Sequence, residues 1–215
     1  MMTIISRTFN EDDGSLYSEL QHQSNYGTVG AVVFHNETAS SGLGKRFYLA
    51  TGNYSSIPTF NYTGMSTSGA HPECVSIGVT IPASASFIKS DACLEVGGTD
   101  WTGEFGGVFT NVMYTAKDDA GTTQNWAIKK VGSGTWTLSG KVSNGGNFTV
   151  DGGEVVFDGE VNNLATLSVN SGATATLGEN LTTFAPTTLA LAGGTLKGEG
   201  SVASGTALNV TCAST

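Results

Sequence analysis

Few side chains in this 215-residue sequence have the types and spacing that metal binding or catalysis requires. The three histidines share no metal-ligand spacing with one another or with a cysteine, so we interpret each as a surface or turn residue. The acidic stretches at 11–13 and 118–119 lack the alternating carboxylates and the glycine of a calcium loop, and solvated turns explain them better. We therefore predict no metal site and no cofactor. The histidines are His22, His35 and His71.

Two carboxylates, Asp151 and Asp158, are the candidates for acid–base chemistry. Polysaccharide-cleaving solenoid enzymes gather several carboxylates on one exposed strand face. In the internal repeats of this chain the neighbouring positions are mostly not acidic, so no column of carboxylates is expected. We predict no catalytic residue and no enzymatic activity. The equivalents are Asn170 and Ala192 for the first carboxylate, and Leu177 and Glu199 for the second.

The three cysteines, Cys74, Cys93 and Cys212, are too few for a disulfide framework in a chain of this length. Cys74 and Cys93 are 19 residues apart, as are the strand residues that follow them, Val75 and Leu94. If those residues stack on adjacent coils, the two cysteine Cα atoms come about 5 Å apart, within the range of a disulfide. Cys74 and Cys93 are therefore a candidate disulfide. Two reduced cysteines that fill small internal sites are the equal alternative, and Cys212 is left unpaired.

The elements that would position these side chains come from an internal repeat. Segments 147–159, 166–178 and 188–200 share one pattern and align without a gap, and a fourth copy begins at Leu208. Equivalent positions are 19, 22 and 19 residues apart, which is the length of one coil of a solenoid. Two apolar columns follow from the alignment: Phe148, Leu167, Leu189 and Leu208, and Val150, Val169, Leu191 and Val210.

Within each copy, apolar and polar residues alternate as they do in a half-buried β-strand. One such strand cannot bury its apolar face alone, whereas strands stacked about 4.8 Å apart form a continuous internal ladder. Glycines at the ends of the strands supply the positive φ that tight corners need. The sequence therefore predicts an all-β fold, a parallel β-helix.

Residues 126 to about 210 resemble the autotransporter-associated β-strand repeat. Residues 130–140 read Lys-Val-Gly-Ser-Gly-Thr-Trp-Thr-Leu-Ser-Gly and follow the Lys-x-Gly-x-Gly-Thr core of that family. Residues 148–153, Phe-Thr-Val-Asp-Gly-Gly, and 194–202, Gly-Thr-Leu-Lys-Gly-Glu-Gly-Ser-Val, are similar to its second and closing strands. The Tyr-Thr-Gly-Gly stretch that usually precedes the second strand is missing. The resemblance covers less than half of the chain.

This resemblance implies a right-handed, single-stranded and pectin-lyase-like β-helix in the passenger region of a large secreted or cell-surface bacterial protein. The family motif is structural, so it implies a non-catalytic stalk or adhesin-like module, anchored in the outer membrane through regions outside this sequence. A carbohydrate-binding or polysaccharide-processing β-helix is the alternative. Exposed aromatic residues would favour binding, and buried ones would favour the stalk. The aromatic residues concerned are Tyr54, Phe60, Tyr62, Trp101 and Tyr114.

Composition agrees with a turn-rich β-protein, with 30 glycines, 4 prolines and 13% charged residues. We expect little helix beyond a short piece near 16–23. The formal net charge of −9 argues against nucleic acid as a partner, because phosphate binding needs a basic surface. A host glycan or a surface protein is the expected partner.

We expect residues 1–125 to form an irregular β region and residues 126–215 to form the regular repeats. Apolar runs at 27–34, 45–50 and 75–81 predict strands in the first part, which we place in the same stack, with a separate β-sandwich as the alternative. The N-terminus has no apolar run of signal-peptide length, and no segment approaches a membrane span. The fourth copy stops within its coil, which predicts a piece of a longer protein with an open strand edge able to self-associate.

Overall fold

The computed structural model describes the side chains of residues 60–67, 93–111 and 125–211, and the backbone of further strands. Every regular element in the described segments is a β-strand, which confirms the predicted all-β class. The helix expected near 16–23 is wrong over its first part, because Leu16–Glu19 forms strand β2. No helix in these segments is long and apolar enough to cross a membrane. The described backbone comprises 7–10, 16–19, 29–36, 46–53, 59–69, 74–80, 93–113, 122–123 and 125–211.

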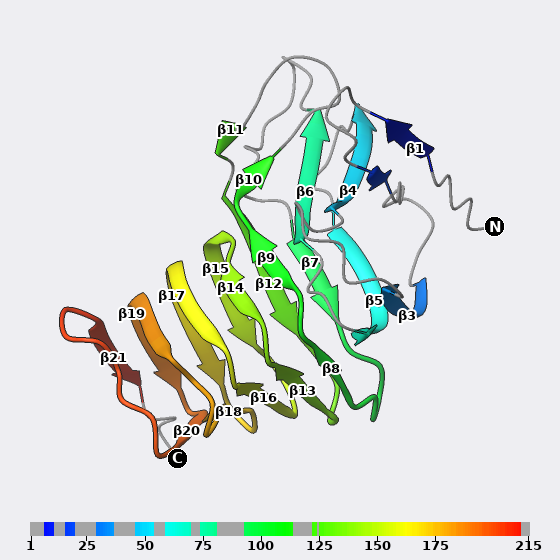
Figure 1. The fold of residues 1–215 in the computed structure, drawn as a ribbon. Helices are drawn as coiled ribbons and strands as arrows, with labels where there is room; N and C mark the ends of the chain where they lie inside the picture. Colours follow the sequence, from blue (N-terminus) through cyan, green and yellow to red (C-terminus); the bar gives the residue numbers. More distant parts are fainter. Residues whose placement is uncertain are drawn as a thin grey trace.

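Most strands are stacked in parallel on three faces of a solenoid, which runs across Figure 1 from β5 to β21. Face 1 contains β3 (Val29–Asn36), β5 (Thr59–Gly69), β7 (Cys93–Val96), β12 (Trp126–Lys130), β15 (Gly145–Val150) and β21 (Ala207–Thr211), with the second halves of β17 (Glu160–Asn170) and β19 (Thr183–Ala192). Face 2 contains β8 (Gly103–Phe105), β13 (Thr135–Leu138), β16 (Glu154–Phe157), β18 (Thr174–Leu177) and β20 (Thr195–Gly198). Face 3 contains β4 (Arg46–Asn53), β6 (Cys74–Thr80), β9 (Val108–Thr110), β14 (Lys141–Ser143) and the first halves of β17 and β19.

From β7 to β19 the chain visits faces 1, 2 and 3 in turn, and each circuit is one coil of a right-handed parallel β-helix of about four turns. The predicted fold class is thereby confirmed. Two antiparallel pairs lie outside the faces: β1 (Arg7–Asn10) pairs with β2, and β10 (Val112–Met113) pairs with β11 (Thr122–Thr123). The second pair lies between β9 and β12, so the coil that contains it is longer than the following ones.

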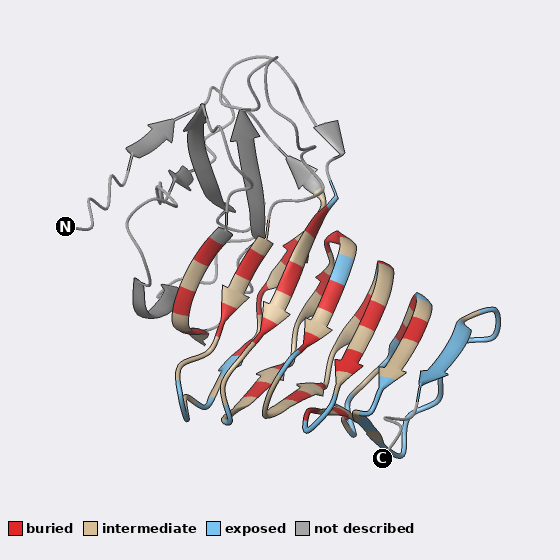
Figure 2. Ribbon diagram, turned by 180° about the vertical axis from the view of Figure 1, so that it is seen from behind, coloured by how far each residue is buried: buried red, intermediate tan, exposed pale blue. Residues whose placement is uncertain are grey.

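The register confirms both apolar columns predicted from the repeats. Phe148 pairs with Leu167, Leu167 with Leu189, and Leu189 with Leu208. The columns also extend upstream of the repeats, through Phe60, Leu94 and Ile128 in the first column and through Tyr62, Val96 and Lys130 in the second. Figure 2 shows the buried residues alternating along these strands.

The gap-free alignment of the repeats holds only for their first strand, and beyond it a gap is needed. Glu154 of β16 pairs with Thr174 of β18, so the corner of the second copy is one residue longer than that of the first. The additional residue fits in a tight turn, in which the Ala173 amide donates to the Asn170 carbonyl over 3.0 Å. Because Phe157 pairs with Leu177, the position equivalent to Asp158 is Gly178, and the predicted equivalence with Leu177 is wrong.

The cysteine register predicted from the 19-residue spacing is also wrong. Strand β6 pairs with β4 and β9 on face 3, whereas β7 pairs with β5 and β12 on face 1. Cys74 is therefore aligned with Val108, and Cys93 with Ala127. Cys93 is a free, half-buried thiol, and Cys212 lies outside the described residues. The spacing misleads because a coil has three strands, so two strands 19 residues apart need not share a face.

Candidate functional surface

The interior of the solenoid contains a stack of aromatic rings that runs through successive coils. Phe105 and Phe109 are stacked with ring centroids 4.5 Å apart, and further contacts follow at 5.7, 6.3, 5.4 and 5.7 Å. Separations of about 4.5–7 Å with offset or edge-on rings are favourable for aromatic pairs. We call this stack the aromatic column; its members are Phe105, Phe109, Trp136, Phe148, Phe157 and Phe184.

The indole N–H groups of Trp136, in this column, and of Trp126, which packs against Phe109, are hydrogen-bonded, so both rings add packing without an unpaired donor. Trp136 Nε1 donates to the Met65 carbonyl over 2.9 Å, which ties β13 to a strand 71 residues earlier. Trp126 Nε1 donates to the Thr110 carbonyl over 2.9 Å. The Trp126 indole therefore joins neighbouring coils, and the Trp136 indole reaches β5, two coils earlier.

All described aromatic side chains except that of Trp101 are buried in the interior. Phe60 and Tyr62, which were candidates for exposed binding residues, are 0% and 2% exposed. Trp101 is half-buried and packs against the core, with its ring lying on the backbone of Gly64 and Gly103. A Cβ at those glycines would come 2.1 and 2.4 Å from ring atoms, so both positions need glycine while the ring is there. Tyr54 and Tyr114 lie outside the described side chains.

The lysine of the Lys-x-Gly-x-Gly-Thr motif is an internal corner clamp. Lys130 occupies a position in the second apolar column, between Val96 and Val150, and is fully buried. Its Nζ donates to the carbonyls of Val131 at 2.7 Å, Gly132 at 3.1 Å and Gly152 at 3.4 Å. These carbonyls belong to corners of two successive coils. Burial lowers the pKa of the Lys130 ammonium from its usual value, because the charge has lost its solvation.

The glycines of the same motif are required by the close approach of the preceding coil. A Cβ at Gly132 would lie 1.7 Å from the Gly98 carbonyl oxygen, and one at Gly134 would lie 1.9 Å from the Trp101 carbonyl oxygen. Gly132 also has a φ of 73°, which favours glycine. Each part of this motif therefore has a contact within the stack.

On the outside of face 1, the Asp151 carboxylate binds side chains of the two neighbouring coils. Asp151 Oδ2 lies 2.8 Å from Lys129 Nζ, and Asn170 Nδ2 donates to Asp151 Oδ1 over 2.5 Å. Glu95 lies 3.8 Å from the same ammonium. Hydrogen bonds from Lys129 and then from Asn170 hold the pKa of Asp151 below its usual value. Asp151 is thus an ionised link between three coils, which does not suit a proton donor.

A similar link crosses face 2. Glu154 Oε1 accepts a hydrogen bond from the Thr176 hydroxyl at 2.5 Å and lies 3.1 Å from Lys197 Nζ. The Thr176 hydrogen bond is the main reason that the pKa of Glu154 is lowered, with Lys197 adding to it. On face 3, Lys141 Nζ lies 3.2 Å from Glu160 Oε1. Each described outer face therefore carries a cross-coil ion pair.

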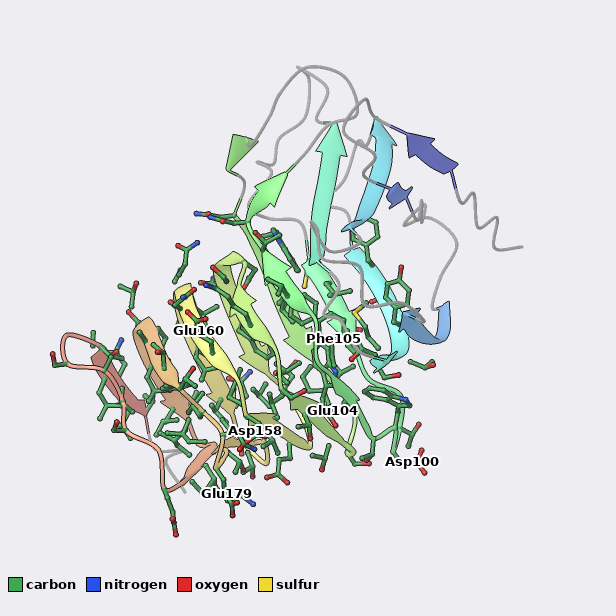
Figure 3. All side chains as sticks on the ribbon, viewed as in Figure 1. Asp100, Glu104, Phe105, Asp158, Glu160 and Glu179 are labelled. Carbon is green, nitrogen blue, oxygen red and sulfur yellow. The ribbon has the colours of Figure 1, made fainter. Side chains whose placement is uncertain are left out.

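The other labelled carboxylates are spread along the stack, as Figure 3 shows for Asp100, Glu104, Asp158 and Glu179. Asp158 accepts hydrogen bonds from the backbone amide of Asn180 at 3.0 Å and from its side chain at 2.9 Å. Among the described side chains, no three His, Cys, Asp or Glu residues converge as metal ligands would. The acidic stretches at 11–13 and 118–119 and the side chains of the three histidines lie outside this part.

A small hollow of about 190 Å³ lies beside the first half of β19. Its walls contain apolar, serine and threonine side chains and no titratable group, so it offers no acid or base to a ligand. The lining residues are Leu181, Thr182, Thr183, Phe184, Ser201 and Ala203.

Comparison of the chain with family models, with curated proteins and with solved structures gives no match. The function proposed for the chain therefore rests on its fold and contacts. Sequence reasoning identified the apolar columns but missed two features of the site. The sequence does contain a signal for the burial of Lys130. The residue stands two positions after Ile128, and the corresponding residues of the neighbouring coils are the buried Val96 and Val150. The aromatic column has no comparable sequence signal, since its members come from all three faces.

Proposed function

We propose that the chain acts as a rigid, non-catalytic stalk or spacer in a large secreted or cell-surface protein, of the kind that the autotransporter-like repeat implies. The observation that carries this proposal is the continuous interior. Large aromatic residues pack inward from coil to coil instead of standing on the surface, where a glycan-binding site would use them. The cross-coil ion pairs and the Lys130 clamp join neighbouring coils in addition.

A stalk works through its length. Each added coil lengthens the solenoid by about 4.8 Å, because that is the distance between paired strands. Each coil contacts mainly its neighbours, so coils can be added or removed with little effect on the rest. A large surface protein would use such a unit to hold a distal region away from the cell.

Coil duplication tests the spacer role. Residues 148–166 span one period between Phe148 and Leu167, and variants would carry one, two or three additional copies. We expect folded proteins whose maximum dimension in small-angle X-ray scattering rises by about 4.8 Å per copy. Unfolded variants, or a dimension that does not change with copy number, would reject the spacer role.

The location requires a separate experiment. Intact cells that produce the protein naturally would be treated with a protease that does not cross membranes, and the chain would be followed with an antibody. We expect the region to be cleaved or released from intact cells. Full protection until the cells are lysed would contradict a surface or secreted location, and would leave the spacer role to the scattering experiment.

Trp101 supports a second candidate function, carbohydrate binding. Its half-buried ring is held flat on Gly64 and Gly103, beside the exposed residues Thr102 and Glu104. Aromatic rings in such surroundings stack on sugar rings in many binding sites. A glycan array with the wild-type chain and a Trp101→Phe variant tests this: saturable binding that weakens in the variant supports a binding module, and an array without binding removes this candidate.

A further inference from the structure

Asn-x-Thr triplets recur along the solenoid, and such a triplet is the acceptor motif for an N-linked glycan when its middle residue is not proline. Three of them lie in coils that have a described coil on each side. The motif alone does not distinguish these three, so their surroundings decide which of them can carry a glycan. They are 61–63, Asn-Tyr-Thr, 147–149, Asn-Phe-Thr, and 180–182, Asn-Leu-Thr.

The Asn147 side chain points outward from face 1. Asn147 is exposed, whereas Phe148, the next residue of β15, is fully buried, as expected for neighbours on a strand. The strand also has an additional residue here. Gly145 and Phe148 pair with Trp126 and Ile128, so two residues of β15 lie opposite one residue of β12. A bulge of this kind leaves one residue outside the regular ladder, which makes this part of the strand more accessible than its surroundings.

Hydrogen bonds distinguish Asn147 from Asn180, which is also exposed. Within the described part of the chain, no hydrogen bond holds the Asn147 side chain. Asn180 Nδ2, in contrast, donates to Asp158 Oδ2 over 2.9 Å, and the Asn180 backbone N–H donates to Oδ1 over 3.0 Å. The Thr182 hydroxyl of the same triplet donates to the Gly159 carbonyl over 3.2 Å. The Asn180 triplet is therefore used in contacts between coils, and the Asn147 triplet keeps its amide free.

The surface around Asn147 also has room for a sugar. On the outside of face 1, the residues in the same row of the neighbouring coils have small side chains. A glycan is bulky and begins directly at the asparagine nitrogen, so it needs such surroundings. Asn61 lacks them, because it is half-buried in β5 and aligned with Glu95. The small residues of the row are Cys93, Ala127, Thr166 and Thr188.

We propose that Asn147 is the acceptor of an N-linked glycan. In this reaction Asn147 Nδ2 loses a proton and forms a bond to the anomeric carbon of a sugar. The bond from that carbon to a pyrophosphate oxygen breaks, and its electron pair leaves with the pyrophosphate. The donor is therefore a sugar activated as a pyrophosphate ester, carried by a lipid or by a nucleotide. This modification goes beyond the spacer role and does not depend on it.

Mass spectrometry of the protein from cells that produce it naturally tests the proposal. Digestion after lysine gives one peptide, 142–197, that contains both Asn147 and Asn180. We expect this peptide to carry a sugar mass, and fragmentation should place the sugar on Asn147 and leave Asn180 unmodified. A peptide without sugar, or one with sugar on Asn180 alone, would overturn the proposal.

A second experiment tests the structural reason for the choice of Asn147. The folded 215-residue chain is incubated with a lipid-linked oligosaccharide and its transferase, or with a nucleotide sugar and its transferase, and the occupancy of each asparagine is measured. The donor that modifies the chain identifies the carrier. We expect Asn180 to react about tenfold more slowly than Asn147 or slower still, because its hydrogen bonds to a carboxylate have to break first.

Variants of the same chain provide the matched controls. Thr149→Ser should keep the modification of Asn147 and Thr149→Ala should lose it, because the motif requires a hydroxyl at that position. Asp158→Ala releases the Asn180 amide and should raise the occupancy of Asn180 without changing that of Asn147. Circular dichroism should show each variant to be folded. Equal modification of both asparagines in the folded wild type, or loss of Asn147 modification in Asp158→Ala, would contradict the selection of Asn147 by its free amide.

Discussion

Lys130 is the residue whose position departs most from the pattern around it. Its ladder neighbours are Val96 and Val150, yet the ammonium group is retained in the interior. The carbonyls of Val131, Gly132 and Gly152 explain this, since they are corner acceptors that a valine could not satisfy. Burying the ammonium group among three neutral oxygens costs its solvation free energy and gains three hydrogen bonds. Because the solvation cost applies to the charged form, the net contribution to stability depends on whether the group is protonated.

Replacing Lys130 with methionine should destabilise the fold by about 1–3 kcal/mol at neutral pH, because buried acceptors lose a donor. The loss should increase with pH. Since the folded-state pKa of Lys130 is lowered, the unfolded chain binds more protons between that pKa and 10.5, and the contribution of this residue rises through that window. Urea unfolding of both proteins at pH 7 and pH 10 measures the difference.

Taking the difference between the two proteins removes other groups that titrate in the alkaline range. Burial raises the pKa of the Cys93 thiol to about 11 and that of the Tyr62 hydroxyl well above its usual value. Both groups are present in the wild type and in Lys130→Met, so their effects cancel to first order. A free-energy difference that is smaller at pH 10 than at pH 7 would show that folding raises the pKa of Lys130, which contradicts a pKa lowered by burial.

At the scale of the strand, the buried columns are the main determinant of stability. Leu167 is fully buried between Phe148 and Leu189. Leu167→Asp places an unpaired carboxylate among apolar side chains and should cost about 4 kcal/mol or more, enough to unfold a marginal domain. Ser168→Asp, on the same strand but facing outward, should have a small effect. Thermal unfolding of both variants measures this, and equal midpoints would contradict the column.

The corners between faces 2 and 3 depend on glycine for a steric reason. A Cβ at Gly159 would lie 1.9 Å from the Gly140 carbonyl oxygen, whereas a Cβ at Gly172, in a corner between faces 1 and 2, would meet nothing within 4 Å. Gly159→Ala should therefore force two coils apart and cost several times more than Gly172→Ala. The latter costs about 1 kcal/mol, through its positive φ alone. Chemical unfolding of the two variants compares them, and equal losses would mean that the corner adjusts freely.

The sequence was sufficient for the strands and columns but not for the corners. Phe148, Leu167 and Leu189 were placed in one column because apolar alternation and period depend on the strand alone. The additional residue between Asn170 and Thr174 was missed, because a turn absorbs one residue without changing the pattern on either side. The cysteine register failed for a related reason: spacing along the chain does not specify which of three faces a strand occupies.

For the whole molecule, burial decreases toward one end. Strands β12, β13, β15, β16 and β18 alternate buried and partly exposed residues, whereas β20 and β21 contain no buried residue. In a solenoid each coil is stabilised mainly by its neighbours, so stability should follow this gradient instead of being uniform. The aromatic column ends at Phe184 in the first half of β19, which agrees with the position of the decrease.

This gradient predicts an order of amide hydrogen exchange. Amides in β13, β15 and β16 should exchange most slowly and those in β20 and β21 fastest. Phe148→Ala should speed exchange in its own coil and in the preceding one, because Phe148 contacts Phe157 in the former and Trp136 in the latter. Phe184→Ala should act mainly near β19, since its ring contacts Phe157 alone within the column. Uniform exchange along the stack, or equal reach of the two substitutions, would mean that the chain unfolds as one cooperative unit and that the aromatic column does not transmit stability from coil to coil.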